Sequence, residues 1–162
     1  MTNTSKEIEK TPNVENEVTV VNTADVVTNL SASIFENTSS ALFSTINATD
    51  RKSKIKLYNA ISDSKNSLDD HKGEVLEITD FVAHPITLQD ESTGQDVEAM
   101  RIVLIDKNGE GYHAVSAGVV SSMQRIIGIV GQGPWTDEPL EVVAVEKKTR
   151  RGYKTLTLSL QG

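Results

Sequence analysis

The sequence contains no cysteine among its 162 residues, which excludes disulfides, thiolate nucleophiles and thiolate metal sites. No apolar run approaches the roughly 20 residues that a bilayer-spanning helix needs. The first ten residues, MTNTSKEIEK, lack the basic and then apolar order of a secretory signal. These absences predict a soluble protein of a reducing compartment, which we expect to be the cytoplasm.

Residues suited to catalysis or to metal binding are also few. The histidines are His71, His84 and His113. His71 has two acidic neighbours in LDDHKG, but all three residues belong to a single polar turn. A metal site normally takes its ligands from several elements, so this turn is a weak candidate for one. GIVGQGP (128–134) is rich in glycine but lacks a following Lys-Ser/Thr pair, and no G-x-S-x-G elbow is present. We therefore predict no enzymatic activity, no cofactor and no metal ion.

Charge is unevenly distributed along the chain, which carries a formal net charge of −7. Residues 1–100 hold 8 Lys/Arg against 17 Asp/Glu, whereas residues 101–162 hold 8 against 6. This asymmetry favours an anionic partner for the C-terminal half, although the acidic total weakens simple attraction to nucleic acid.

The chain divides into a polar tail and one modest domain. In the first 40 residues, 18 are Ser, Thr or Asn and one is aromatic, and no hydrophobic period is sustained, which predicts a flexible tail over residues 1–40. Residues 41–162 are expected to form the domain. It begins with a short strand in ALFSTI (41–46), and Asp50 then caps a helix in RKSKIKLYNAI (51–61). Lys54, Leu57, Tyr58 and Ile61 fall at helical spacing, and Tyr58 is assigned to the packing of this helix.

After a turn-rich stretch (62–73), strand and helix patterns follow one another. EVLEITDFVAH, stopped by Pro85, and EAMRIVLID have the composition and alternation of strands. Asn108 and Gly109 turn the chain into a third strand. The next apolar residues follow a helical period, with Ser116 as a cap and GQGP as the exit. PLEVVAVEKK and YKTLTLSLQ alternate as two strands that TRRG joins.

The order of three strands, one helix and two strands predicts a mainly β fold. It fits the OB-fold, a five-stranded Greek-key barrel with its helix between strands three and four, here over about residues 73–160. A strand and a helix precede the barrel. OB-folds bind single-stranded nucleic acids and oligosaccharides on one face, which HPITLQDESTGQD and KKTRRG would flank.

The second of these loops carries the predicted nucleic-acid-binding cluster. Lys and Arg neutralise phosphates whatever the base sequence, and the alternative is a solvated hairpin tip that keeps a sheet edge from aggregating. We also include Arg101, which lies on the opposite face of its strand from Met100 and Ile102. The basic residues of the tip are Lys147, Lys148, Arg150, Arg151 and Lys154.

Aromatic residues make up only 4% of the chain, so their positions are informative. Tyr112 and Tyr153 lie at strand starts and Trp135 follows the helix, where a ring could stack on a base and contribute roughly 1 to 3 kcal/mol. The alternative for each is a half-buried packing residue. Phe81 is expected in the core or on the barrel surface. The second basic run is RKSKIK (51–56). It either extends the nucleic-acid path or forms the solvated face of a helix, and the sequence favours neither.

Several strings occur in one order along the chain: KIKLYNAI, FVAHPITL, VLIDKNGEGYHAVSAGV, GPW and KTRRGYKTLTL. Together they resemble the single-stranded-DNA-binding proteins encoded by phages and mobile elements of Gram-positive bacteria, over about residues 41–160. The resemblance implies an OB-type domain that coats single-stranded DNA during replication or recombination in a bacterial host cell. Phage replication or recombination proteins are further possible partners.

Two other functions remain open at this stage. A β-barrel adaptor that binds a protein partner in a phage or mobile-element complex would suit the acidic total, and a small hydrolase is a third, weaker alternative. Self-association is also open, because barrel edges and the first 40 residues are both available for it. The sequence contains nothing that chooses DNA over RNA.

Overall fold

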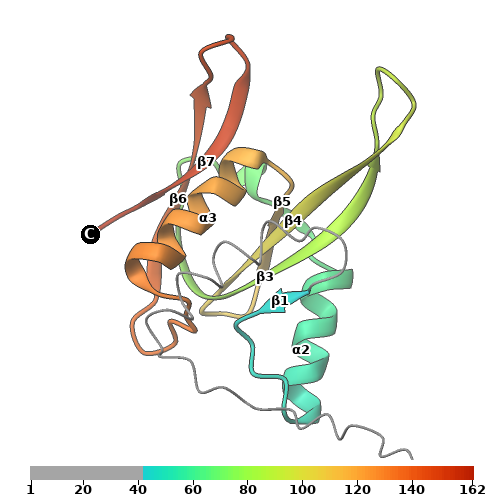
Figure 1. Cartoon of the computed structure of the whole chain (residues 1–162). Helices are drawn as coiled ribbons and strands as arrows, with labels where there is room; N and C mark the ends of the chain where they lie inside the picture. Colours follow the sequence, from blue (N-terminus) through green and yellow to red (C-terminus); the bar gives the residue numbers. More distant parts are fainter. Residues whose placement is uncertain (1–41) are drawn as a thin grey trace, which may run out of the picture.

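The computed structural model describes residues 42–162, and the tail predicted for residues 1–40 lies outside this part of the chain. The described part is mainly β, with two α-helices (Figure 1). In chain order its elements are β1 (Phe43–Ser44), α2 (Arg51–Ser62), β2 (Asn66–Ser67), the short 3₁₀ helix η1 (Leu68–His71), β3 (Val75–Gln89), β4 (Asp96–Asp106), β5 (Gly111–Ala114), α3 (Ala117–Val130), β6 (Leu140–Lys148) and β7 (Lys154–Leu160).

The strands in the described residues form one curled sheet that resembles half of a barrel (Figure 1). Its order is β2-β5-β4-β3-β6-β7, with β1 added beside β3. Among the strands that the structure describes, only β2 and β5 pair in parallel. The five predicted barrel strands correspond to β3 through β7, but the sheet contains seven strands within residues 42–162. The sequence did not predict β2, because a strand made of two polar residues, Asn66 and Ser67, has neither an apolar run nor a period to detect.

The longest strand, β3, continues through Pro85, and the prediction that Pro85 stops it is wrong. Pro85 pairs in register with Met100 of β4. Pairing with β6 covers only Val75–Ile78 and pairing with β1 ends at Ala83, so β3 has a single neighbour beyond that point. A proline, which has no N–H to donate, is tolerated on such an edge. The predicted loop 84–96 is therefore mostly strand, and β3 and β4 extend into a long hairpin.

Helix α3 covers the main hydrophobic core on one face of the sheet. It begins at the predicted cap, where the Ser116 side chain accepts a hydrogen bond from the Gly118 N–H, and ends at Gly131, whose φ is 107°. Its buried residues include Val119, Met123 and Ile127, which pack with Phe81 and its neighbours on the strands. Among the described residues, no helix is long and apolar enough to cross a membrane.

The same helix is hydrogen-bonded to β7 along the open side of the half-barrel. Ser116 Oγ donates to the Leu156 carbonyl at 2.8 Å, and the Leu158 N–H donates to Ser122 Oγ at 3.1 Å. Gly118 allows this close approach, because an added Cβ would lie 2.3 Å from the Leu156 oxygen. The helix thus satisfies a strand edge that would otherwise be open.

Helix α2 covers a second, smaller core on the opposite face. Asp50 is its cap, as predicted, and accepts a hydrogen bond from the Ser53 N–H at 2.9 Å. The buried carboxylate of Asp80 accepts a hydrogen bond from Thr45 Oγ1 and forms an ion pair with Lys56 Nζ, both at 3.1 Å, which ties α2 to β3. The residues of this core are Ile46, Leu57, Ala60, Ile61, Val82, Val103 and Ile105.

The turn-rich stretch 62–73 proves to be part of the packed structure. Leu68 is fully buried in the main core. Asn66 and Ser67 pair with β5, and Lys72 bridges to Ala144 of β6. The stretch therefore spans from one side of the half-barrel to the other.

Candidate nucleic-acid interface

Two hairpin arms extend from the body of the protein in the same general direction (Figure 1). The β3–β4 arm turns through residues 90–95, and the β6–β7 arm turns through residues 149–153. In the second turn the Thr149 N–H donates to the Tyr153 carbonyl at 2.7 Å, and Gly152 adopts the left-handed conformation, with φ 84°. This turn holds the predicted basic cluster at the tip of the β6–β7 hairpin.

All five predicted basic residues of this cluster are solvent-exposed on the β6–β7 arm. Lys148 and Lys154 lie opposite each other in register. Lys147 is adjacent to Lys148 along β6 and therefore belongs to the other face of the arm. Tyr153, which is 71% exposed, lies among these cations. An exposed ring surrounded by cations is suited to stacking on a base while the cations contact phosphates.

Part of this positive charge is paired within the protein. Lys154 Nζ lies 2.8 Å from Glu146, and Lys72 Nζ lies 3.6 Å from the same carboxylate. The hydrogen bond from Lys154 lowers the pKa of Glu146, so this carboxylate stays ionised at neutral pH. Among the described residues, Lys147, Lys148, Arg150 and Arg151 form no ion pair. These four cations of the arm are therefore the ones most available to an external phosphate.

The other predicted contacts are not brought to this arm. Tyr112 is only 7% exposed and meets His71 edge-to-face at a ring distance of 5.0 Å, so it has no free face for a base. Trp135 is half-buried and stacks on Phe81 at 6.0 Å, next to a hollow lined by carboxylates and by no Lys or Arg. Arg101 lies half-buried at the base of the β3–β4 arm, opposite His84.

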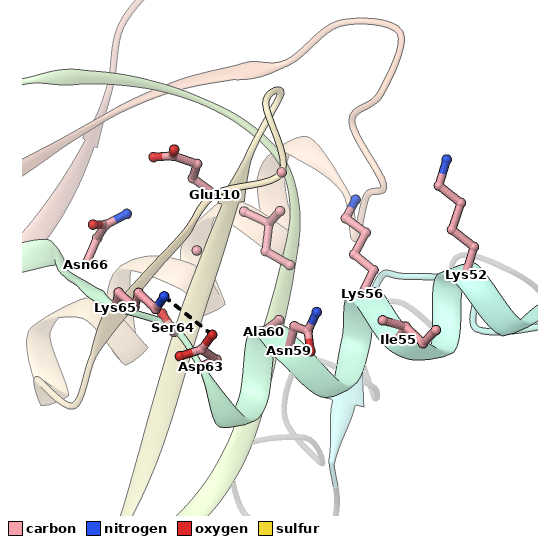
Figure 2. Close-up of a pocket in the computed structure, with 13 residues that line it drawn as sticks. Lys52, Ile55, Lys56, Asn59, Ala60, Asp63, Ser64, Lys65, Asn66 and Glu110 are labelled. Carbon is pink, nitrogen blue, oxygen red and sulfur yellow. Dashed lines mark ion pairs between the residues drawn. The ribbon is translucent and has the colours of Figure 1, made fainter.

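The basic run on α2 borders a groove of about 530 Å³ between this helix and the β4–β5 turn. Figure 2 shows Lys52 and Lys56 extending from α2, and an ion pair between Asp63 and Lys65. Lys56 is bound to Asp80, and Glu110 adds a further negative charge to the lining. The groove is therefore only weakly positive.

Sequence reasoning missed one exposed aromatic residue. Tyr58 was assigned to packing, but it is 68% exposed, so that prediction is wrong. Arg51 and Lys54 precede it by seven and four residues and are also exposed, so the three occupy one side of α2. The charged residues at this spacing were the signal that Tyr58 belongs to a solvent-facing stripe.

Within residues 42–162, no group of three or more His, Asp or Glu side chains is arranged to hold a metal ion. His71 Nδ1 lies 2.8 Å from Glu74, and Asp69 pairs with Lys72. Asp69 and His71 of LDDHKG are thus engaged in separate local contacts.

The chain matches one family of known proteins. The model of the phage single-stranded DNA-binding protein family matches residues 36–161. The chain is also similar to the single-stranded DNA-binding protein of Bacillus phage GA-1, with 25% identity over 166 residues that cover 94% of this chain and 93% of the relative. No solved structure gives a significant match. Because the family model covers most of its length, the chain belongs to the phage single-stranded DNA-binding protein family.

Proposed function

We propose that this protein binds single-stranded DNA through its β6–β7 arm. The observation that carries the proposal is the gathering of five exposed cations and one exposed tyrosine at the end of a single ordered hairpin, in a chain of this phage family. Lys and Arg bind phosphates independently of base sequence and release condensed counterions. Tyr153 adds a ring on which any base can stack. Binding is therefore tolerant of sequence and weakened by salt.

We further infer that the half-barrel is an open variant of the OB-fold. The order β5-β4-β3-β6-β7, with α3 between β5 and β6 along the chain, supports this assignment, because the OB-fold is a partly open five-stranded barrel. The hydrogen bonds that join α3 and its cap Ser116 to β7 take the place of a pairing between β5 and β7. In this arrangement the β6–β7 hairpin, which carries the cations, borders the binding face.

The exposed stripe of α2 is a candidate extension of the DNA path. Arg51 and Lys54 supply charge and Tyr58 supplies a second exposed ring, the same combination as on the arm. Tyr112 and Trp135 are left out of the interface because both rings pack against other aromatic side chains.

The biological role that follows is the coating of single strands in phage DNA replication or recombination, without a chemical reaction or a cofactor. The family match does not favour the alternative of an adaptor whose only partner is a protein.

The direct experiment is a titration of fluorescently labelled oligonucleotides of equal length, single-stranded and duplex, followed by anisotropy. Stacking needs unpaired bases, so we expect tighter binding of the single strand, modest dependence on base composition and a decline in affinity with salt. Equal or tighter binding of the duplex would refute the proposal.

A further inference from the structure

The β3–β4 arm has a composition that is difficult to reconcile with DNA contact. Residues 85–100 contain four carboxylates and no Lys or Arg. Asp90 shapes the turn by accepting hydrogen bonds from the N–H groups of Ser92 and Thr93. The other three carboxylates, of Glu91, Asp96 and Glu98, are exposed. Beside a DNA strand they would repel the phosphates.

The same arm carries an apolar pair that the described part of the chain leaves exposed. Leu88 and Val97 lie opposite each other in register and are 42% and 46% exposed. Exposed apolar groups next to carboxylates fit a partner that offers both cations and an apolar or aromatic side chain.

The chain itself provides such a partner surface in its other arm. Arg150 and Arg151 complement the carboxylates in charge. The exposed ring of Tyr153 has two faces, so one face can meet Leu88 and Val97 while the other stacks on a base. Because the two arms extend in the same general direction from different parts of the body (Figure 1), two copies placed side by side bring the β3–β4 arm of one close to the β6–β7 arm of the next.

We propose that the acidic β3–β4 arm of one copy docks on the basic β6–β7 arm of the neighbouring copy along the same DNA strand. The proposal rests on the proposed function, because the DNA holds the copies side by side and raises their effective concentration. The contact is head-to-tail, so it repeats without closing and extends along the strand. The two faces of the β6–β7 arm, represented by Lys147 and Lys148, permit one face to meet DNA and the other to meet the neighbour.

The test compares cooperativity with intrinsic affinity in the full chain. A dT oligonucleotide on the order of 8 nucleotides long, short enough for one copy, reports intrinsic affinity, and a long dT homopolymer reports cooperativity. Replacing Glu91→Lys and Glu98→Lys places like charges against the basic arm. We expect cooperativity to fall by about tenfold or more, while affinity for the short oligonucleotide does not fall.

A matched control reverses the charge at two exposed positions outside both arms. It carries Asp137→Lys and Glu138→Lys, in the loop between α3 and β6. It makes the same change in net charge and is expected to keep the wild-type cooperativity. A second variant, Leu88→Ser with Val97→Ser, removes the apolar pair without changing charge and is expected to reduce cooperativity.

The decisive variant exchanges the charges of the two arms. Adding Arg150→Glu and Arg151→Glu to the Glu91→Lys and Glu98→Lys protein should restore cooperativity, even though intrinsic affinity decreases. Non-cooperative binding by the wild type, unchanged cooperativity in the Glu91→Lys and Glu98→Lys protein, or an equal loss in the control would overturn the inference. Failure of the short single strand to bind at all would instead refute the proposed function.

Discussion

The β3–β4 and β6–β7 arms have the same backbone form and opposite chemistry. Each is a two-stranded antiparallel ribbon that extends beyond the body, and each turn is closed by its own hydrogen bonds. One carries four carboxylates and an exposed aliphatic pair, whereas the other carries five cations and an exposed tyrosine. The fold therefore supplies two arms of similar form, and their side chains decide which of them can attract a phosphate backbone.

The local charge of the basic arm also differs in sign from the net charge of the whole chain. The net charge of −7 describes a protein that repels DNA at long range. A local cluster acts within about a Debye length, roughly 10 Å at 0.1 M salt, so the basic arm can bind while the acidic arm and the body disfavour contact elsewhere. We expect acidic surfaces of this kind to restrict the DNA to one path.

The largest expected effect comes from removing charge on the basic arm. If these side chains bind phosphates as proposed, replacing Lys148, Arg150 and Arg151 with Ala removes three phosphate contacts, each worth about 0.7 in the slope of log affinity against log salt. At 0.1 M salt this corresponds to roughly a hundredfold weaker binding of a short single strand. Circular dichroism should show an unchanged fold, because all three side chains are exposed.

A smaller effect is expected from the exposed rings. Tyr153→Ala should weaken binding by about 1 to 3 kcal/mol and leave the salt dependence almost unchanged, since stacking releases few counterions. Tyr58→Ala tests the α2 extension in the same assay. A Tyr153→Ala protein with wild-type affinity would show that the arm binds through charge alone.

The acidic arm should respond in the opposite direction. We propose that Glu91 and Glu98 do not contact DNA. Replacing both with Ala removes two negative charges, so affinity for a short oligonucleotide should stay the same or increase a few-fold at low salt. Weaker binding of the short oligonucleotide would mean that this arm contacts DNA directly, and the contrast between the arms would be lost.

The smallest change is expected from removing the N-terminal residues. Both arms and both cores belong to residues 42–162, so a chain that begins at Ala41 should fold and bind a short single strand almost as the full chain does. Insoluble or unfolded protein would show that residues 1–40 contribute to the domain.

Much of the fold was predictable because its elements have strong local signals. The caps Asp50 and Ser116, the Asn108–Gly109 turn and the helical period of α3 were all confirmed. The course of β3 was not predicted correctly, because whether Pro85 ends a strand depends on which side of that strand has a neighbour. That depends on contacts between residues far apart in the sequence.

The exposure of the candidate site residues was predictable only where several charged residues lie close together in the sequence. The basic cluster of the β6–β7 arm stood out in the sequence, and the structure places it on an exposed hairpin. Single aromatic residues carried no such signal, because a strand start is compatible with burial, as for Tyr112, and with exposure, as for Tyr153. Which occurs depends on whether a second element, such as the one that bears His71, covers the ring.

The central claim is that the basic arm, and not the acidic one, contacts the phosphates. Its most direct test is the salt dependence of affinity for one short single strand, measured with the wild type and with the Lys148→Ala, Arg150→Ala and Arg151→Ala protein. We predict that the slope of log affinity against log salt becomes shallower by about 2 in the variant. An unchanged slope in a folded variant would contradict the account, because the phosphates would then lie on another surface.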